Sequence, residues 1–328
     1  MLDDEKGRDA FIPWWWLRGG HRQTIAAALL PRPNLLPVPE KRLFEVEPGM
    51  RVLTWCNWRD DRHSALTVVI VHGLEGSSES QYVIGTANKA WSAGMNVVRM
   101  NVRNCGGSEA LSPTLYHSGL SHDVGMVVRE LISTDRLPRI ALAGFSMGGN
   151  MALKLAGEWG SEAPRELRAL AVVCPGIDLA ATADALHLWR NRIYEWNFLH
   201  YLKRSVRRKA RLFPERYDLA RFRGVRTLRQ FDDAVTAPAW GFANADDYYA
   251  RASAWPFLER IAVPTLVIHA QDDPFVCITP ATRSRLLTNR NVRLLEAEHG
   301  GHCAFLAEPK GYDGRWAERQ IVEFLQRY

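Results

Sequence analysis

Residues 139–159 read RIALAGFSMGGNMALKLAGEW, and this stretch decides the fold. An apolar run of strand length leads into Gly144-Phe145-Ser146-Met147-Gly148, and a helical pattern rich in Ala, Leu and Met follows it. G-x-S-x-G alone occurs by chance, but between a strand and a helix it is typical of a serine nucleophile. The turn is tight and strained, so very small residues are needed two positions before and after the serine. The stretch therefore predicts a nucleophile at Ser146; a glycine-rich turn with an incidental serine is the alternative.

Strand-like and helix-like patterns alternate on both sides of this turn. The strand-like runs are almost entirely apolar, as expected where helices cover both faces of a parallel sheet. Residues 43–58 alternate loosely around Pro48-Gly49 and predict a β-hairpin. Further strands are expected at residues 66–71, 96–100, 139–143, 170–174, 264–270 and 292–295, and helices at residues 79–93, 120–132, 147–159, 280–287 and 314–325. Repeated β-α-β units predict the α/β class, with a mostly parallel, doubly wound sheet.

The alternation stops at about residue 178 and resumes at about residue 263. Between these positions lie helical patches rich in arginine and aromatic residues, without a strand run of comparable quality. An insertion after the sixth strand is where a lid would sit. We therefore expect four segments: an irregular, proline-marked N-terminal arm packing on the core (1–40), the first part of the core (41–177), a helical basic lid (178–258) and the second part of the core (259–328).

A serine hydroxyl needs a base to become a nucleophile. At a turn of this kind, a carboxylate and then a histidine follow the serine in the chain. Asp272-Asp273 comes directly after the expected strand 264–270, and His299-Gly300-Gly301-His302 follows the last strand. We expect Asp273 and His302 to complete a triad with Ser146, because the paired glycines let the His302 loop reach the serine. Asp272 is the alternative acid, and His299 is expected to hold the loop.

Acyl transfer also needs two N–H donors for the oxyanion. The N–H of Met147, directly after the nucleophile, is the first candidate. The second is expected in the loop after strand 66–71, His72-Gly73-Leu74-Glu75-Gly76, where we favour the N–H of Leu74. This chemistry requires no metal and no organic cofactor. A metal interpretation of the His-x-x-His pattern is weak, because no further ligand cluster stands at a suitable spacing.

The composition is that of an ordinary globular protein, with 47% hydrophobic and 24% charged residues. No stretch approaches the roughly 18 apolar residues that can cross a bilayer, and residues 1–10 lack the pattern of a signal peptide. The five cysteines are odd in number, and their spacings suit neither zinc nor a disulfide framework. We therefore expect a cytoplasmic protein.

Charge is concentrated in residues 189–229, which hold thirteen Lys or Arg and three acidic residues, a net of +10 in a chain of net +6. Three interpretations compete: a solvated helical lid, a surface that docks on anionic membranes or binds an anionic lipid head group, and a nucleic-acid surface. The second would place the protein peripherally at a membrane. Nucleic acid is not expected, because no nucleic-acid motif accompanies the charge. Asp232 and Asp233 are expected to be structural and to pair with nearby arginines; a role in lining the site is the alternative.

These motifs belong to a larger set by which the chain resembles the YheT-like branch of the α/β-hydrolases, relatives of the eukaryotic ABHD lipid hydrolases. The resemblance runs almost end to end and implies a carboxylic ester hydrolase acting on acyl or lipid-like esters, with its triad on Ser146, Asp273 and His302. Departures at Arg22 and at Cys303-Ala304 concern the shape of the substrate. The matching motifs are Gly20-His21 with Gln23-Thr24-Ile25, His72 to Ser77, Asn101 to Gly107, Gly144 to Asn150, Phe231-Asp232-Asp233 with Thr236-Ala237-Pro238, Asp246 to Tyr249, Asp272 to Phe275, and His299 to His302.

The residues and the resemblance together predict a serine esterase that forms an acyl-enzyme with a small-molecule acyl ester. A thioesterase, a lipase or an acyltransferase with the same triad is an alternative. These enzymes differ in the length of the acyl group and in the acceptor, and the sequence does not reveal either. A catalytically silent α/β-hydrolase-fold binding protein is less expected, because all three triad residues are present.

Overall fold

The computed structural model describes residues 10–328, so the expectation for residues 1–9 lies outside it. Its centre is a single eight-stranded sheet. The strands are β1 (Glu40–Glu47), β2 (Met50–Asn57), β3 (Thr67–Val71), β4 (Asn96–Met100), β5 (Ile140–Phe145), β6 (Leu167–Val173), β7 (Thr265–Ala270) and β8 (Val292–Ala297). They lie in the order β1-β2-β4-β3-β5-β6-β7-β8. β1 and β2 form an antiparallel hairpin, β2 runs antiparallel to β4, and every other pairing is parallel. The predicted α/β class and mostly parallel sheet are confirmed.

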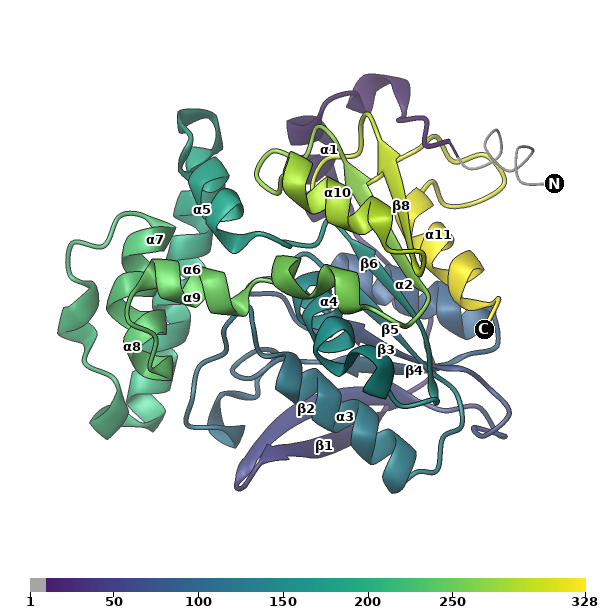
Figure 1. Ribbon diagram of the computed structural model, residues 1–328, viewed down its shortest axis with the longest axis horizontal. Coiled ribbons are helices and arrows are strands. Elements are labelled where there is room, and N and C mark those ends of the chain that lie inside the picture. Colours follow the sequence, from purple (N-terminus) through teal and green to yellow (C-terminus); the bar gives the residue numbers. More distant parts are fainter. Residues whose placement is uncertain (1–9) are drawn as a thin grey trace.

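Helices cover both faces of this sheet (Figure 1). The helices of residues 10–328 are α1 (Gly20–Leu29), α2 (Gln81–Ser92), α3 (Ser121–Ser133), α4 (Met147–Trp159), α5 (Leu179–His187), α6 (Arg192–Leu212), α7 (Leu228–Phe231), α8 (Ala237–Trp240), α9 (Ala245–Ala252), α10 (Pro280–Thr288) and α11 (Trp316–Leu325), of which α5 to α9 stand apart from the two faces (Figure 1). α3 and α4 pack against each other, and α2 packs against α11. These two pairs cover opposite faces, because their buried side chains belong to two separate apolar clusters.

The alternation of side chains along β3 explains why the strand needs both layers. Val69 and Val71 join the cluster that contains α3 and α4, whereas Val68 and Ile70 join the cluster that contains α2 and α11. All five residues of β3 are buried, so the strand reads as a continuous apolar run. The burial of this run between two helical layers fixes the strand at the centre of the sheet.

The chain between β6 and β7 contributes helices α5 to α9, which gather at one side of the sheet (Figure 1). They include α6, the longest helix in residues 10–328. A π-helical turn, Asp232–Thr236, joins α7 to α8. Within residues 10–328, no helix combines the length and the apolar character that a membrane crossing needs.

The N-terminal arm differs from its predicted irregular course, because residues 20–29 form α1. Gln23 anchors this helix to the C-terminal part of the core. Its side-chain amide donates to the Leu306 carbonyl at 3.0 Å and accepts from the Leu306 N–H at 2.7 Å. The four prolines stand after the helix, at residues 31–39, and do not interrupt it.

Candidate active site

Ser146 stands at the turn between β5 and α4 with a left-handed backbone, φ 53° and ψ −116°. Such a conformation is strained for a residue with a side chain. It persists because neighbouring glycines allow the turn to pack closely. A Cβ on Gly148 would lie 2.4 Å from the Val71 carbonyl oxygen, and one on Gly144 would lie 2.6 Å from the Gly148 oxygen. The glycines that the sequence required at the turn are therefore needed sterically, and the serine is held at the N-terminus of α4.

The structure brings Ser146, His302 and Asp273 into one hydrogen-bonded chain. His302 Nε2 lies 3.0 Å from Ser146 Oγ, and His302 Nδ1 lies 2.7 Å from Asp273 Oδ2. The other carboxylate oxygen of Asp273 accepts from the N–H groups of Phe275 and Val276 at 3.1 and 3.0 Å. These bonds fix the carboxylate and, through it, the orientation of the imidazole.

The neighbouring acid and histidine form a second, separate pair. Asp272 Oδ2 lies 3.1 Å from His299 Nδ1, and Asp272 Oδ1 accepts from the Gly301 N–H at 2.9 Å. Asp272 therefore holds the loop that carries His302, while Asp273 contacts His302 itself. The geometry separates the two acids between which the sequence left a choice.

The backbone N–H groups of Leu74 and Met147 have no acceptor within residues 10–328. The N–H groups on either side of Leu74 are both used, since Gly73 donates to the Tyr82 hydroxyl and Glu75 donates to the Tyr116 hydroxyl. Leu74 and Met147 line the same pocket as Ser146. Both therefore stay the predicted donors for a developing oxyanion.

His72 braces the Leu74 loop. Its Nε2 accepts from the Val102 N–H at 3.1 Å, so its Nδ1 carries the proton and donates to the Gly73 carbonyl at 2.7 Å. Burial lowers the pKa of His72 to about 4, which keeps the ring neutral. His72 thus ties the loop after β3 to the loop after β4 and does not contact Ser146.

Comparison with known proteins agrees with this fold. A family model described as the alpha/beta hydrolase fold matches residues 67–309. The chain belongs to this family. It is 33% identical, over 97% of its own length and 93% of the other protein, to YheT of Escherichia coli (strain K12), whose name provisionally describes it as an esterase. It is 24% identical to Phospholipase ABHD3 of Homo sapiens, over 97% of this chain and 79% of that protein.

Among solved structures, the Pyrococcus furiosus esterase Pf2001 superposes with a TM-score of 0.59 at 16% identity, over 91% of this chain and 99% of that chain. This likeness shows the fold alone. The matches with the curated relatives place the chain in the YheT-like branch of the α/β-hydrolase family.

Electrostatics in this α/β-hydrolase site favour an ion pair between His302 and Asp273. Burial opposes ionisation of Asp273, but the charge and hydrogen bond of His302 outweigh it and lower the carboxyl pKa below its usual value. Burial likewise opposes a charged His302, but the Asp273 carboxylate outweighs it and raises the imidazole pKa well above 6.5. The Asp273 carboxylate therefore stabilises the imidazolium that forms when His302 accepts a proton.

A pocket opens beside Ser146. Most of its lining is apolar and comes from helices between β6 and β7, including Leu179, Leu186, Phe198, Leu202 and Phe231. Those helices therefore supply most of the cavity walls, while the loops after β3 and β5 contribute Leu74, Ser146 and Met147.

Sequence reasoning missed the residues that hold the His302 loop from outside. Thr24 Oγ1, on α1, accepts from the His302 N–H at 2.9 Å. The Phe275 ring lies against the imidazole, with centroids 4.3 Å apart. A Cβ on Gly301 would lie 2.4 Å from the Gly20 carbonyl oxygen, so α1 packs directly on this loop. The motif Gln23-Thr24-Ile25 was the available signal, but no local pattern connects it to a loop almost 280 residues away.

The prediction that Asp232 and Asp233 pair with arginines is wrong. Asp232 accepts from the hydroxyls of Thr236 and Tyr249, both at 2.7 Å, and Asp233 accepts from the Ala245 N–H at 2.7 Å. The nearby arginine, Arg229, pairs with Asp184 and Asp246 instead. Asp232 lines the pocket, and burial raises its pKa to about 6.

Proposed function

We propose that this chain hydrolyses carboxylic esters of apolar acyl chains through an acyl-enzyme on Ser146. The observation that carries the proposal is the hydrogen-bonded chain from Ser146 through His302 to Asp273, together with two N–H groups of pocket-lining residues that have no acceptor within residues 10–328. The relatives named esterase and phospholipase support ester hydrolysis as the reaction.

In the first half-reaction, His302 Nε2 removes the proton from Ser146 Oγ, which attacks the carbonyl carbon. The N–H groups of Leu74 and Met147 stabilise the tetrahedral oxyanion. Asp273 holds the imidazole in the tautomer whose Nε2 accepts a proton and stabilises the imidazolium that forms. The imidazolium then protonates the leaving alcohol. In the second half-reaction, His302 activates a water molecule that releases the acid.

The apolar lining of the pocket supports a substrate whose acyl group is apolar and binds in this pocket. Fully burying one methylene contributes about 0.8 kcal/mol, so longer chains bind more tightly until the cavity is filled. The lining of the pocket is mainly apolar, as in cavities that hold small-molecule ligands. No metal or organic cofactor takes part in the proposed steps.

The test is hydrolysis of p-nitrophenyl esters from acetate to palmitate by the wild type and by Ser146→Ala, together with labelling by a fluorophosphonate probe. We expect activity and labelling in the wild type only, with an optimum in chain length set by the pocket. Activity equal in both proteins would remove Ser146 from the mechanism. Absence of both activity and labelling in the wild type would favour a catalytically silent binding protein.

Thioesterase, lipase and acyltransferase activities use the same triad and differ in substrate or acceptor. Acyl-CoA thioesters and emulsified long-chain triglycerides distinguish the first two from a simple esterase. Addition of an alcohol to the assay separates the third, because an acyltransferase then yields a new ester in place of the acid.

We further propose that this hydrolase docks on anionic lipid surfaces through an exposed stripe formed by Trp189, Ile193 and Trp196. These side chains are 84%, 67% and 67% exposed, and their spacing of four and three residues places Ile193 and Trp196 on one face of α6. The stripe belongs to residues 189–229, which carry a net charge of +10. Apolar side chains beside basic ones are the pattern of helices that lie in an anionic interface.

The inward face of α6 links this stripe to the site, since Phe198 and Leu202 line the pocket. Flotation with vesicles of phosphatidylglycerol and phosphatidylcholine tests the docking. Trp189→Ala/Trp196→Ala should lose binding, and Leu287→Ala, at a side chain 65% exposed on α10, should keep it. Binding that is insensitive to salt, or equal loss in both variants, would contradict the proposal.

A further inference from the structure

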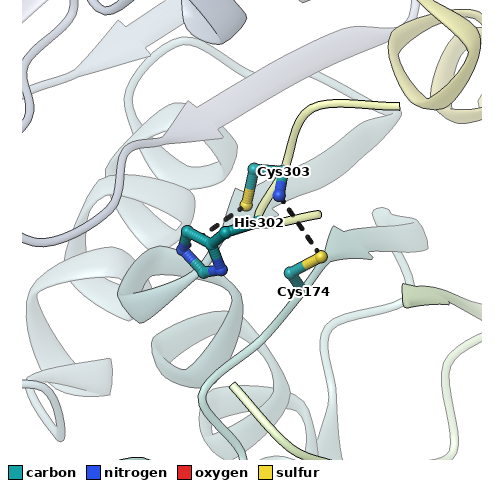
Figure 2. A group of neighbouring side chains, drawn as sticks. All are labelled: Cys174, His302 and Cys303. Atoms are coloured by element: carbon teal, nitrogen blue, oxygen red, sulfur yellow. Dashed lines mark hydrogen bonds between the residues drawn. The ribbon is translucent and has the colours of Figure 1, made fainter. Parts of the chain in front are cut away.

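Two cysteines lie against the histidine of the triad (Figure 2). Cys303 Sγ is 3.8 Å from His302 Nε2, and Cys174 Sγ accepts from the Cys303 N–H at 3.4 Å. Both sulfur atoms and one ring nitrogen of His302 lie within 4.8 Å of one another. The steps proposed for ester hydrolysis use neither thiol.

The fold brings these groups together from two distant segments. Cys174 directly follows β6, and Cys303 stands in the loop after β8, which Thr24 and Asp272 hold in place. Both cysteines have left-handed backbones, with φ 43° and 57°. Cys174 is buried, whereas His302 and Cys303 are partly exposed.

The spacing and the ligand types fit a soft divalent cation. Zn–S bonds of about 2.3 Å and Zn–N bonds of about 2.0 Å place a tetrahedral sulfur and nitrogen about 3.5 Å apart and two sulfur atoms about 3.8 Å apart. The separation of Cys303 Sγ and His302 Nε2, 3.8 Å, is close to the first value, and all three ligand atoms lie within 4.8 Å of one another. Thiolate and imidazole ligands select Zn²⁺ and its heavier relatives over Mg²⁺ or Ca²⁺. Because only a thiolate binds a cation, both thiols release their protons when the ion binds.

We propose that Cys174, Cys303 and a ring nitrogen of His302 form a binding site for a thiophilic divalent cation, Zn²⁺ or Cd²⁺, with water in a fourth position. Bound there, the cation engages the imidazole that the hydrolysis requires. It therefore inhibits reversibly. That inhibition rests on the proposed function, whereas the binding does not.

A neighbouring group of potential ligands, Cys174, His269 and Asp273, is the weaker site. All three of its residues are buried, so an ion has no exposed side from which to enter. The Asp273 carboxylate is already occupied by three hydrogen bonds. Cys303 is therefore the residue that distinguishes the proposed site.

The test is a titration of the reduced full-length chain with Cd²⁺, followed by the near-ultraviolet absorption of the Cd²⁺–thiolate bond. Ester hydrolysis is measured in parallel with Cd²⁺ and Zn²⁺. We expect one Cd²⁺ per chain, inhibition with the same midpoint, and recovery on addition of EDTA. Cys303→Ser and Cys174→Ser should each raise the binding midpoint by at least about 10–100-fold, the loss that changes in outer-shell partners alone produce. Cys277→Ser, at an exposed cysteine outside the cluster, should leave it unchanged.

Ser146→Ala separates this inference from the proposed function, because it removes the nucleophile and retains all three ligands. Cd²⁺ absorption in Ser146→Ala equal to that of the wild type is the expected result, whether or not the wild type hydrolyses esters. Absence of thiolate absorption, or midpoints unchanged in both Cys303→Ser and Cys174→Ser, would overturn the site. The two cysteine variants are independent, so misfolding of one leaves the other as the test.

Discussion

Replacement of Asp273 by Asn, compared with the same replacement at Asp272, tests the assignment of the acid most sharply. The two residues are adjacent, yet they contact different histidines. Asp273 lies 2.7 Å from His302, and Asp272 lies 3.1 Å from His299. Each substitution exchanges one carboxylate oxygen for an NH₂ group of the same size, so packing is preserved in both.

The expected magnitudes follow from which group each oxygen serves. In Asp273→Asn, the amide oxygen can keep the two backbone bonds from Phe275 and Val276, which turns the NH₂ group toward His302 Nδ1. Nδ1 must then accept, so Nε2 carries the proton and cannot take another from Ser146. An inverted tautomer in a triad of this type lowers kcat by about 10⁴-fold, or about 5 kcal/mol.

In Asp272→Asn, the amide oxygen can keep the bond from the Gly301 N–H, and its NH₂ group faces His299, which does not touch Ser146. The cost is limited to one altered hydrogen bond, about 0.5–1.5 kcal/mol, which corresponds to about tenfold at most. Steady-state kinetics on a p-nitrophenyl ester, with Ser146→Ala as the baseline and thermal unfolding as the check on folding, measures both. The reasoning is refuted if Asp272→Asn loses more activity than Asp273→Asn, or if Asp273→Asn stays within tenfold of the wild type.

Three further predictions concern the same site. Asp273 raises the pKa of His302 above 6.5, and only the neutral imidazole is a base. We therefore expect kcat/KM to fall as pH drops through a value above 6.5. A midpoint below pH 6 in the pH–rate profile would contradict this. Gly148→Ala places a Cβ 2.4 Å from a β3 carbonyl oxygen and should destabilise the fold by about 1–3 kcal/mol in denaturant unfolding, whereas Gly176→Ala, with no atom nearer than 3.7 Å, should be tolerated. Thr24→Val removes the acceptor of the His302 N–H and should cost about 1–3 kcal/mol of stability, with a lower kcat measured in the same preparation; unchanged kinetics and melting would show that α1 does not hold this loop.

The parallel core could be predicted because each strand carries its own signal. Residues 96–100 were predicted as a strand and residues 147–159 as a helix, and β4 and α4 have those bounds. Buried on both faces, such strands need unbroken apolar runs, which are rare elsewhere in a chain. The helix at residues 20–29 lacks this kind of signal, because its stability comes from contacts such as that of Gln23 with Leu306. Those contacts join the two ends of the chain and leave no local periodicity.

The polar residues of the site could be predicted from the sequence for a related reason. In a parallel sheet, the loops after the strands meet at the carboxyl edge. Leu74 follows β3, Ser146 follows β5, Asp273 follows β7 and His302 follows the last strand, so locating the strands also located the chemistry. The choice between Asp272 and Asp273 depends on side-chain direction one residue apart, and the structure alone separates them by their partners.

The residues of the pocket walls could not be predicted in the same way, and the reason bears on how substrate specificity can change in this branch of the family. Phe198 and Leu202 face the cavity from the same helix that presents Ile193 and Trp196 to solvent. The first half of α6 therefore carries apolar side chains on both faces, and periodicity does not tell which one faces inward. The inward choice is made by packing against loops such as that of Leu74, which belong to the core. Substitutions on α6 can thus alter the acyl chain that fits, or the surface that docks, while the hydrogen bonds of Ser146, His302 and Asp273 stay as they are.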